Sequence, residues 1–434
     1  MNAEAIFASI IFVCTYIAIG MEKIHRTIVT ITAALLLLLS GIVTLPEAID
    51  YISWETIGLL FGLFCVVTAL SETGFFTSLA FIMAKKLEYN TVKILVIFPI
   101  ITGFLSCLMD SITVMLFFAT LTIELTRILK ADPVPIIVAE VCLANTGGAA
   151  TLVGDPPNVI LGTVLGYTFN DFVLHTGPVA LVAGAAAIAY FYIQFRNNMT
   201  VEEVIDYKQL ARFNPRDAIK DTKLMKLCLV TYGIIILLLI IHPVIENAGI
   251  PLTLPLAALI PAFGLLIIAG KRAEMVLSKI DYEVLLFFMG LFVVVGGMEK
   301  TGVIPKIAHA IVGIFEGKPY GLISTLLWGS AVSSSVIDNV PFALSMAYVI
   351  KDVAANSGLM ALSIMVWAVA LGTDIGGNAT PIGASANVVA YNAMQKNRIR
   401  IGWMRWIKIA VPSTLLSIVI ANLLIILKYA LGFY

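Results

Sequence analysis

A glycine-rich stretch that occurs twice inside apolar sequence constrains this chain more than any other feature. The first copy, residues 145–158, reads NTGGAATLVGDPPN, and the second, residues 374–387, reads DIGGNATPIGASAN. Irregular, polar backbone at membrane depth is tolerated only where it is buried in protein or lines a cavity. We therefore expect two interrupted helices whose freed backbone and side chains form a site for an ion or a polar solute.

The composition indicates that the chain lies in a membrane. Of its 434 residues, 60% are hydrophobic and 12% are charged, whereas soluble proteins carry roughly 25% charged residues. Spans of ~20 apolar residues recur along the chain, so we predict an all-α polytopic membrane protein with about 11 spans and two re-entrant hairpins. The apolar segment 6–19 lacks a preceding basic region and is predicted to be a retained span rather than a signal peptide. The lipid bilayer is thus the expected partner, in the plasma membrane.

Several other classes of site are not supported. The five cysteines form no CxxC pair and are interpreted as small buried hydrophobic residues. No G-x-x-x-x-G-K-[ST] motif is present, so we expect neither a nucleotide nor a nucleic acid as partner. An intramembrane aspartyl protease would need a Gly-x-Gly-Asp motif, which Leu152-Val153-Gly154-Asp155 does not match. We therefore predict that the chain is not an enzyme and needs no cofactor beyond sodium ions or protons as coupling ions.

Short apolar arms joined by polar residues predict the two hairpins. Residues 92–104 and 112–123 meet at a polar tip around Asp110, and a second tip lies around Asp338. The predicted divisions are N-terminal spans (1–53), a first repeat (54–195), a polar linker with an amphipathic helix (196–226) and a second repeat (227–434).

One alignment shift relates the two repeats. A shift of 228 residues places Glu55 on Glu283 and Asp110 on Asp338, and with one further inserted residue Asn158 meets Asn387. If the linker is cytoplasmic, 22 of the 27 Lys and Arg residues lie inside. This orientation inverts the second repeat relative to the first, an arrangement that places a transporter's site at the membrane midplane.

The tip carboxylates have two interpretations that can coexist. An ionisable group inside the membrane is by default a functional candidate, here an oxygen ligand for sodium or a proton carrier. Each tip Asp also precedes a helix start and can cap it. Asp155 precedes Pro156-Pro157 and is likewise predicted to be an N-cap.

The glycines release the chain from helical geometry, and their freed carbonyls can coordinate a cation; close helix packing is the alternative role. Sodium is expected at Asp110, Asn145 and Asn158, and at Asp338, Asp374 and Asn387. The full set of predicted ion- or substrate-binding residues is Asp110, Ser111, Thr113, Asn145, Gly147, Gly148, Thr151, Asp155, Asn158, Asp338, Asn339, Asp374, Gly376, Gly377, Asn378, Thr380, Ser385 and Asn387.

These motifs carry a family resemblance. NTGGAATLVGDPPNVILG, SSVIDNVPF and GGNATPIGASANVV resemble the pigmentation P protein branch of the arsenite-pump/P-protein family, in the ion transporter superfamily with citrate permeases and divalent anion/sodium symporters. The resemblance implies a scaffold and a transport domain, a homodimer, and elevator-type alternating access. The hairpin tips differ from the Ser-Asn-Thr of dicarboxylate symporters, which disfavours a di- or tricarboxylate substrate.

Three functions remain open from the sequence. The first is transport of a small anion or oxyacid coupled to sodium or protons, the second is sodium/proton antiport, and the third is an anion channel. We expect no intramembrane Lys or Arg near the motifs, and four acidic residues near the sites, Asp110, Asp155, Asp338 and Asp374, favour a cation as at least one passenger. The family resemblance favours the first function by analogy.

Overall fold

The chain folds into helices that suit a membrane. The computed structural model describes residues 3–21, 23–199, 215–315, 318–357, 362–399 and 401–433, and within them it has 21 α-helices, two short 3-10 helices and no strand. Seven helices are long and apolar enough to cross a membrane: α1 (Ala3–Gly20), α4 (Trp54–Glu72), α7 (Ser111–Ile128), α11 (Gly177–Phe195), α13 (Thr222–Asn247), α16 (Tyr282–Lys300) and α22 (Trp403–Ala430). The prediction of an all-helical multi-span membrane protein is confirmed. The amphipathic helix predicted in the linker falls largely on residues 200–214, outside the described residues.

The order of helices repeats along the chain from its beginning. The helices α2 (Arg26–Leu39) and α14 (Leu254–Ala269) begin 228 residues apart, as do α4 and α16. The shift found in the motifs therefore extends into the N-terminal spans. The short helices α3 (Leu45–Tyr51) and α15 (Arg272–Ser278) also correspond, and α3 replaces part of the loop expected after the second span.

The later helices follow the same order in both halves, except that α10 has no counterpart. Their bounds are α5 (Phe75–Lys86), α6 (Thr91–Ser106), α8 (Pro133–Gly148), α9 (Pro156–Leu165) and α10 (Phe169–His175), then α17 (Val303–Phe315), α18 (Pro319–Val336), α19 (Asn339–Ser357), α20 (Leu362–Gly377) and α21 (Ser385–Lys396).

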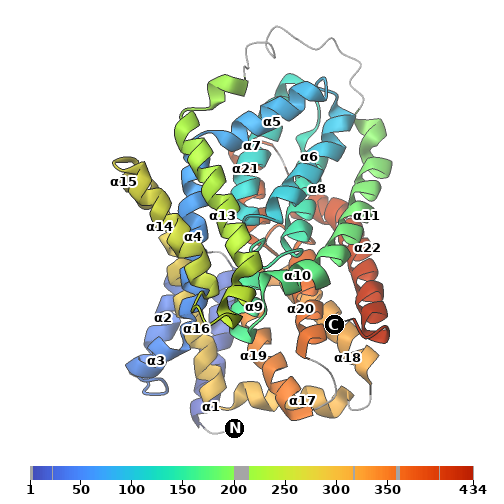
Figure 1. Ribbon diagram of the computed structural model, residues 1–434. Coiled ribbons are helices and arrows are strands. Elements are labelled where there is room, and N and C mark those ends of the chain that lie inside the picture. The colour runs from blue at the N-terminus through green and yellow to red at the C-terminus, as the bar shows by residue number, and fades with distance from the viewer. Residues whose placement is uncertain are drawn as a thin grey trace.

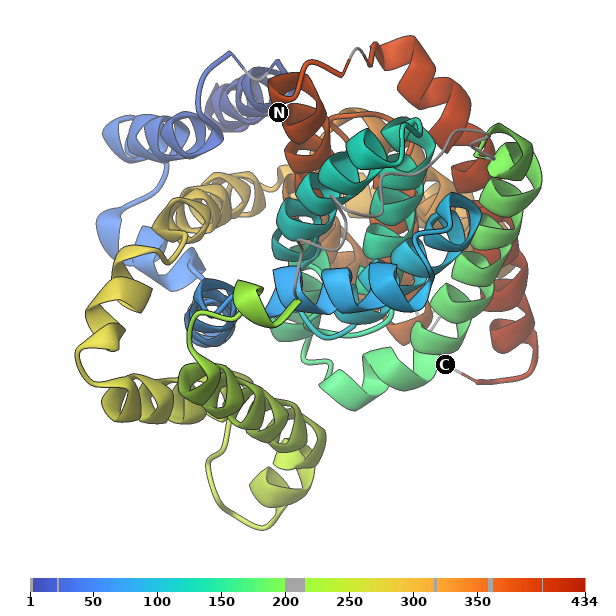
Figure 2. The same ribbon diagram turned by 90° about the horizontal axis from the view of Figure 1, so that it is seen from above.

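The helices form two groups that lie side by side (Figure 2). In the first bundle, α4 packs on α14, α2 on α16, and α1 and α13 join them; the second bundle holds α6–α9, α11 and α18–α22. The helices α5 and α17 run between the bundles at opposite ends of the molecule (Figure 1).

Glycines at duplicated positions permit the closest contacts of the first bundle. A Cβ at Gly62 would lie 2.8 Å from the backbone of Ala258, and one at Gly290 would lie 2.8 Å from the backbone of Thr30. Gly290 lies 228 positions after Gly62, and Ala258 lies 228 positions after Thr30, so the same helix crossing occurs twice.

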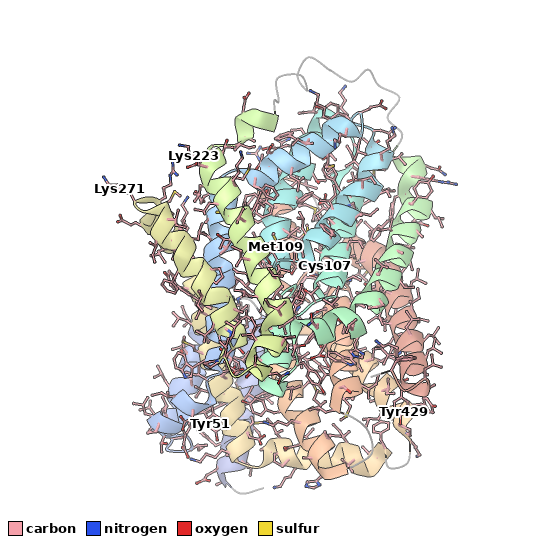
Figure 3. All side chains as sticks on the ribbon, viewed as in Figure 1. Tyr51, Cys107, Met109, Lys223, Lys271 and Tyr429 are labelled. Carbon is pink, nitrogen blue, oxygen red and sulfur yellow. The ribbon has the colours of Figure 1, made fainter. Side chains whose placement is uncertain are left out.

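The two hairpin tips reach the middle of the molecule. Cys107 and Met109, beside the first tip, lie at mid-height in Figure 3, whereas Lys223 and Lys271 lie towards one end and Tyr51 towards the other.

Cys65, Cys142 and Cys228 are buried as predicted, but Cys14 is exposed and Cys107 is half-buried, so that prediction is wrong for Cys14. Cys14 lies on α1, at the edge of the first bundle, where a face of the helix has no protein neighbour.

Candidate functional site

Both predicted helix interruptions are present. The helix α8 ends at Gly148 and α9 begins at Pro156, and in the second half α20 ends at Gly377 and α21 begins at Ser385. Gly147 and Gly376 allow the hairpins to approach, because a Cβ on either would lie within 2.3 Å of the backbone of α6 or α18. The close-packing role of these glycines is therefore visible in the structure, alongside their place at the interruptions.

Two asparagines brace the interrupted segments. Asn158 donates from Nδ2 to the carbonyl oxygens of Gly148 and Thr151, each at 3.0 Å. Asn387 donates in the same way to Gly377, at 2.8 Å, and to Thr380, at 2.7 Å. The amide donors of both predicted ligands are thus used on carbonyls that the interruptions leave free. Oδ1 of Asn387 accepts from Asn145, whereas Oδ1 of Asn158 has no partner among the described residues.

Two threonines fasten the interruptions to the hairpin tips. Thr151 donates from Oγ1 to the carbonyl oxygen of Cys107 at 2.5 Å, and Thr380 donates to that of Ser335 at 2.6 Å. Each contact joins an interrupted segment to the tip of its own repeat. The position of each tip is therefore set by the glycine-rich stretch.

Asp155 joins the two halves of the site. Ser111 donates from Oγ to one carboxylate oxygen at 2.7 Å, and Asn339 donates from Nδ2 to the other at 3.0 Å. Ser111 and Asn339 are the first residues of α7 and α19 and correspond in the duplication. Asp155 stands at the N-cap position of α9, as predicted, but its side chain makes no capping hydrogen bond. The capping role is therefore wrong, because the carboxylate is directed to both hairpins instead.

Asp374 is the unpartnered acid of the site. Its side chain is fully buried, and neither carboxylate oxygen has a hydrogen-bond partner among the described residues. It lies against the carboxyl group of Asp155, close enough for one acid to donate to the other when one of them carries a proton, and beside Asn158, whose Oδ1 also lacks a partner there. A buried carboxylate without a donor or a counter-charge is strongly unfavourable. A proton or a bound cation would remove this cost.

The duplication shows what an uncharged residue does at the corresponding place. Asn145, the counterpart of Asp374, donates from Nδ2 to Oδ1 of Asn378 and to Oδ1 of Asn387, each at 2.9 Å. The first repeat therefore has an amide donor where the second has an acid. The two repeats therefore differ in charge at this buried position.

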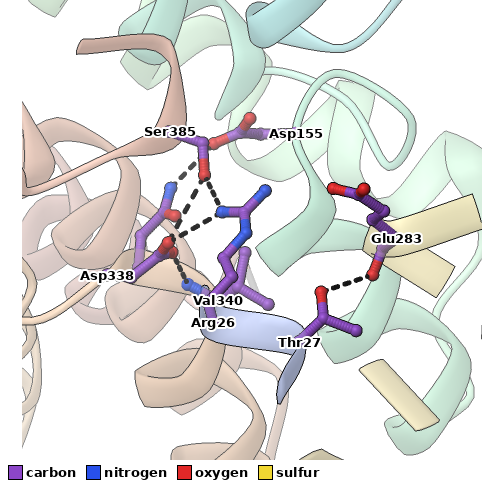
Figure 4. Close-up of polar contacts among 8 residues, drawn as sticks. Arg26, Thr27, Asp155, Glu283, Asp338, Val340 and Ser385 are labelled. Carbon is purple, nitrogen blue, oxygen red and sulfur yellow. Dashed lines mark hydrogen bonds and ion pairs between the residues drawn. The ribbon is translucent and has the colours of Figure 1, made fainter. Parts of the chain in front are cut away.

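The two tip carboxylates are satisfied differently. Asp110 caps α7 by accepting from the backbone N–H and the hydroxyl of Thr113, at 2.8 and 2.9 Å. Asp338 accepts from the backbone N–H of Val340 at 3.1 Å. Its other oxygen accepts from Nη1 of Arg26 at 3.2 Å and from Oγ of Ser385 at 3.3 Å (Figure 4). The predicted capping roles of both tip acids are thus seen, and Asp338 carries an ion pair as well.

Arg26 contradicts the expectation that no Lys or Arg lies near the motifs. Its Nη1 also donates to Oγ of Ser385 at 2.6 Å, and its guanidinium lies 5.1 Å from the ring centroid of Phe287. Arg26 is separated from Asp338 by 312 positions, and the two meet because the first bundle packs beside the second. A signal was present in the sequence: Arg26 falls on Leu254 when the repeats are aligned, so it breaks the duplication.

A further buried acid was also missed. Glu140 in α8 is fully buried and accepts from the hydroxyl of Thr122 at 2.5 Å through Oε1, while its Oε2 has no partner in the part of the chain that the structure describes. Its counterpart in the second repeat is Val369.

The structure thus forms two neighbouring groups. The central group holds Ser111, Asp155, Asn158, Asn339 and Asp374. The second group holds Arg26, Asp338 and Ser385. Asp110 and Thr113 form a cap beside the centre, and Asn145 is bonded to both Asn378 and Asn387. Among the described residues no cluster of three or more His, Cys, Asp or Glu side chains could hold a metal.

Comparison with known proteins identifies the family. Residues 16–372 match the citrate transporter family, CitMHS. The chain belongs to this family. A 46 kDa membrane protein of Mycobacterium leprae is 32% identical, over 98% of this chain and 99% of that protein. An uncharacterized transporter of Mycobacterium tuberculosis is 33% identical, over 98% of this chain and 99% of its own length.

More distant relatives agree with this assignment. The P protein of Mus musculus is 28% identical, and the match covers 96% of this chain and 59% of that protein. The resemblance to P protein predicted from the motifs is therefore confirmed. The structures of MtrF from Neisseria gonorrhoeae and YdaH from Alcanivorax borkumensis each give a TM-score of 0.58, at 13% and 12% identity, over 98% and 99% of this chain and 94% and 99% of theirs. The protein is a secondary transporter of the citrate transporter family and not an enzyme.

Proposed function

We propose that this protein moves a small anion or oxyacid across the membrane and couples its movement to sodium ions or protons. The observation that carries this proposal is the pair of buried carboxyl groups at the meeting point of both hairpins. Asp155 receives two hydrogen bonds, whereas Asp374 beside it receives none from the described residues. A cation or proton between them completes the site.

Electrostatics supports the need for a cation. Two unit charges about 4 Å apart repel by ~4 kcal/mol at an effective dielectric constant of 20. Two neighbouring carboxylates therefore do not both remain ionised without a proton or cation. The guanidinium of Arg26 does not supply that charge to Asp374, because among the described residues it bonds to Asp338 and Ser385 instead. Carboxylate and amide oxygens are suitable ligands for a hard cation such as sodium.

The arrangement of the bundles supports alternating access. Both hairpins and both interrupted helices belong to the second bundle, and α5 and α17 connect it to the first at opposite ends. We propose that the first bundle is the scaffold, through which a homodimer would form, and that the second is the moving transport domain. The two repeats are proposed to be inverted, with the first beginning at α1 and the linker facing the cytoplasm. The likeness of fold to MtrF and YdaH is consistent with this division.

Sodium/proton antiport is the second candidate. It is favoured by the excess of acids over bases at the centre, where Arg26 is already paired with Asp338. In that case Asp155 and Asp374 would bind sodium and protons alternately, with no other solute.

Flux measurements separate the two candidates. The purified protein would be reconstituted into liposomes, and a panel of carboxylates and inorganic oxyanions would be tested under a sodium gradient and a pH gradient. Cation-driven uptake of one anion is expected. Sodium-driven proton movement without any anion would replace symport with antiport, and the absence of both fluxes would contradict the proposal.

A further inference from the structure

The second hairpin tip is held by the first bundle through a charge. Arg26 begins α2, which packs on α16 in the first bundle, while Asp338 and Ser385 belong to the second bundle. The side chain of Asp338 is 12% exposed and that of Arg26 is 28% exposed, so the pair is largely withdrawn from solvent. The ring of Phe287 lies beneath the guanidinium. The pair is therefore a largely buried ion pair between the two bundles rather than a surface ion pair.

Among the described residues, the acid at the first tip, Asp110, has no such ion pair. There, Thr113 supplies both the amide and the hydroxyl that satisfy Asp110. The residue that corresponds to Thr113 in the second repeat is Pro341, which has neither donor. Asp338 thus retains an oxygen that its own helix does not satisfy; Oγ of Ser385 donates to that oxygen at 3.3 Å, and Arg26 supplies a second donor and the charge. The substitution of a threonine by a proline in one repeat opens this position to a cation.

A neutral contact reaches the same hairpin. The hydroxyl of Tyr16, on α1, donates to the carbonyl oxygen of Pro341 at 2.6 Å and lies 2.5 Å from Oγ of Ser345. The first bundle therefore holds α19 in two ways, by a charge at Arg26 and by a hydroxyl at Tyr16. These two contacts can be removed separately.

We propose that Arg26 is a tethered counter-cation, which occupies the carboxylate of Asp338 in the empty transporter and is displaced when the transported cation binds. This inference rests on the proposed function, since it adds a step to cation coupling at Asp338, beside the proposed cation site at Asp155 and Asp374. Displacement of Arg26 removes the charged link between the bundles, so the second bundle moves once the cation has bound. A transporter without its cation remains held by the ion pair, which prevents movement of the empty site.

Competition between Arg26 and the cation predicts the direction in which the apparent cation affinity changes when Arg26 is removed. If Arg26 and the cation compete for Asp338, removal of the arginine must increase the apparent affinity for the cation. If Arg26 only positions Asp338, its removal must leave that affinity unchanged or decrease it. A structural role and the proposed role therefore shift the measured affinity in opposite directions.

The experiment measures cation-driven flux in liposomes with the full chain. The probes are sodium ions at fixed pH and protons at fixed sodium. For Arg26→Gln we expect the half-maximal concentration of the coupling cation to fall about tenfold, which corresponds to ~1.4 kcal/mol. Tyr16→Phe removes a contact from the same bundle to the same hairpin without changing charge, and it should change that concentration less than about twofold, as Arg26→Lys should.

The outcomes are distinct. An unchanged or higher half-maximal concentration for Arg26→Gln overturns the inference, as does an equal decrease for Tyr16→Phe. If Arg26→Gln does not fold, Ser385→Ala removes one hydrogen bond from Arg26 and one to Asp338 while retaining the ion pair, and it should produce a smaller decrease. Wild-type protein without a response to either cation contradicts the proposed function itself. A response that Asp374→Asn abolishes and Arg26→Gln leaves unaltered contradicts this inference alone.

Discussion

Replacement of Asp374 by asparagine should stabilise the protein and abolish its coupling to a cation. The duplication provides the reason, because Asn145 occupies the corresponding position and donates to Asn378 and Asn387 at 2.9 Å. An asparagine at 374 would place an equivalent donor beside Oδ1 of Asn158, which has no partner among the described residues. The same change removes the charge that a coupling cation would neutralise.

The expected stabilisation follows from the buried groups involved. A buried polar atom left without a partner costs about 1–3 kcal/mol, and a new hydrogen bond contributes about 0.5–1.5 kcal/mol. Asp374→Asn satisfies Oδ1 of Asn158 and removes a buried acid with two unpartnered oxygens. We therefore expect the free energy of unfolding to rise by about 1–3 kcal/mol in the absence of sodium.

The assay compares thermal unfolding of the purified variants in sodium-free detergent solution with sodium- and pH-driven flux in liposomes. Asn145→Ala is the matched control, because it removes the donor that exists in the first repeat and should lower Tm. Asp374→Asn should raise Tm and lose cation-driven flux. The reasoning is refuted if Asp374→Asn lowers Tm as much as Asn145→Ala does, or if it transports like wild type.

Two further predictions concern packing and pH. Gly147→Ala would place a Cβ 2.1 Å from the carbonyl oxygen of Gly103, and overpacking of this kind costs about 1–3 kcal/mol or more, so Tm should fall; Gly329→Ala, which meets nothing within 4 Å, should not lower it. A hydrogen bond from Lys300 lowers the pKa of Glu47 from 4.5 to about 2. The resulting stability is present above pH 4.5 and lost as the pH falls towards 2, and unfolding curves of Lys300→Met should show a weaker acid dependence.

The sequence carried the local features of the fold because they depend on neighbouring residues. Glycine pairs predicted where two helices are interrupted, and proline after Asp155 predicted where α9 begins. The duplication was visible because one shift aligns many polar positions. These signals all act within a few residues or repeat at a fixed distance.

The partners of the site residues could not be predicted in the same way. Asp155 meets Asn339 across 184 positions, and Asp338 meets Arg26 across 312. Both contacts depend on how the hairpins and bundles pack, which hydrophobic periodicity does not specify. The capping prediction for Asp155 failed for this reason: a short acid before a helix suits a cap, but here stronger donors from two other helices bind it.

Residues at which the duplication fails proved more informative than residues at which it holds. In the alignment of the two repeats, Asp374 corresponds to Asn145, Arg26 to Leu254, and Pro341 to Thr113. Conserved pairs such as Asn158 and Asn387 make equivalent contacts that support the frame. Two of these differences, Asp374 and Arg26, place a charged residue at or beside the centre, where we propose that the cation binds.

Charge movement on solid-supported membranes tests the central claim most directly. Proteoliposomes would receive a rapid increase in sodium concentration and, separately, a rapid decrease in pH, with no anion substrate present. We expect at least one of the two jumps to produce a transient current in wild type, and both Asp155→Asn and Asp374→Asn to abolish it. Equal currents in wild type and both variants, or no current in response to either jump, would contradict a cation site at this carboxylate pair.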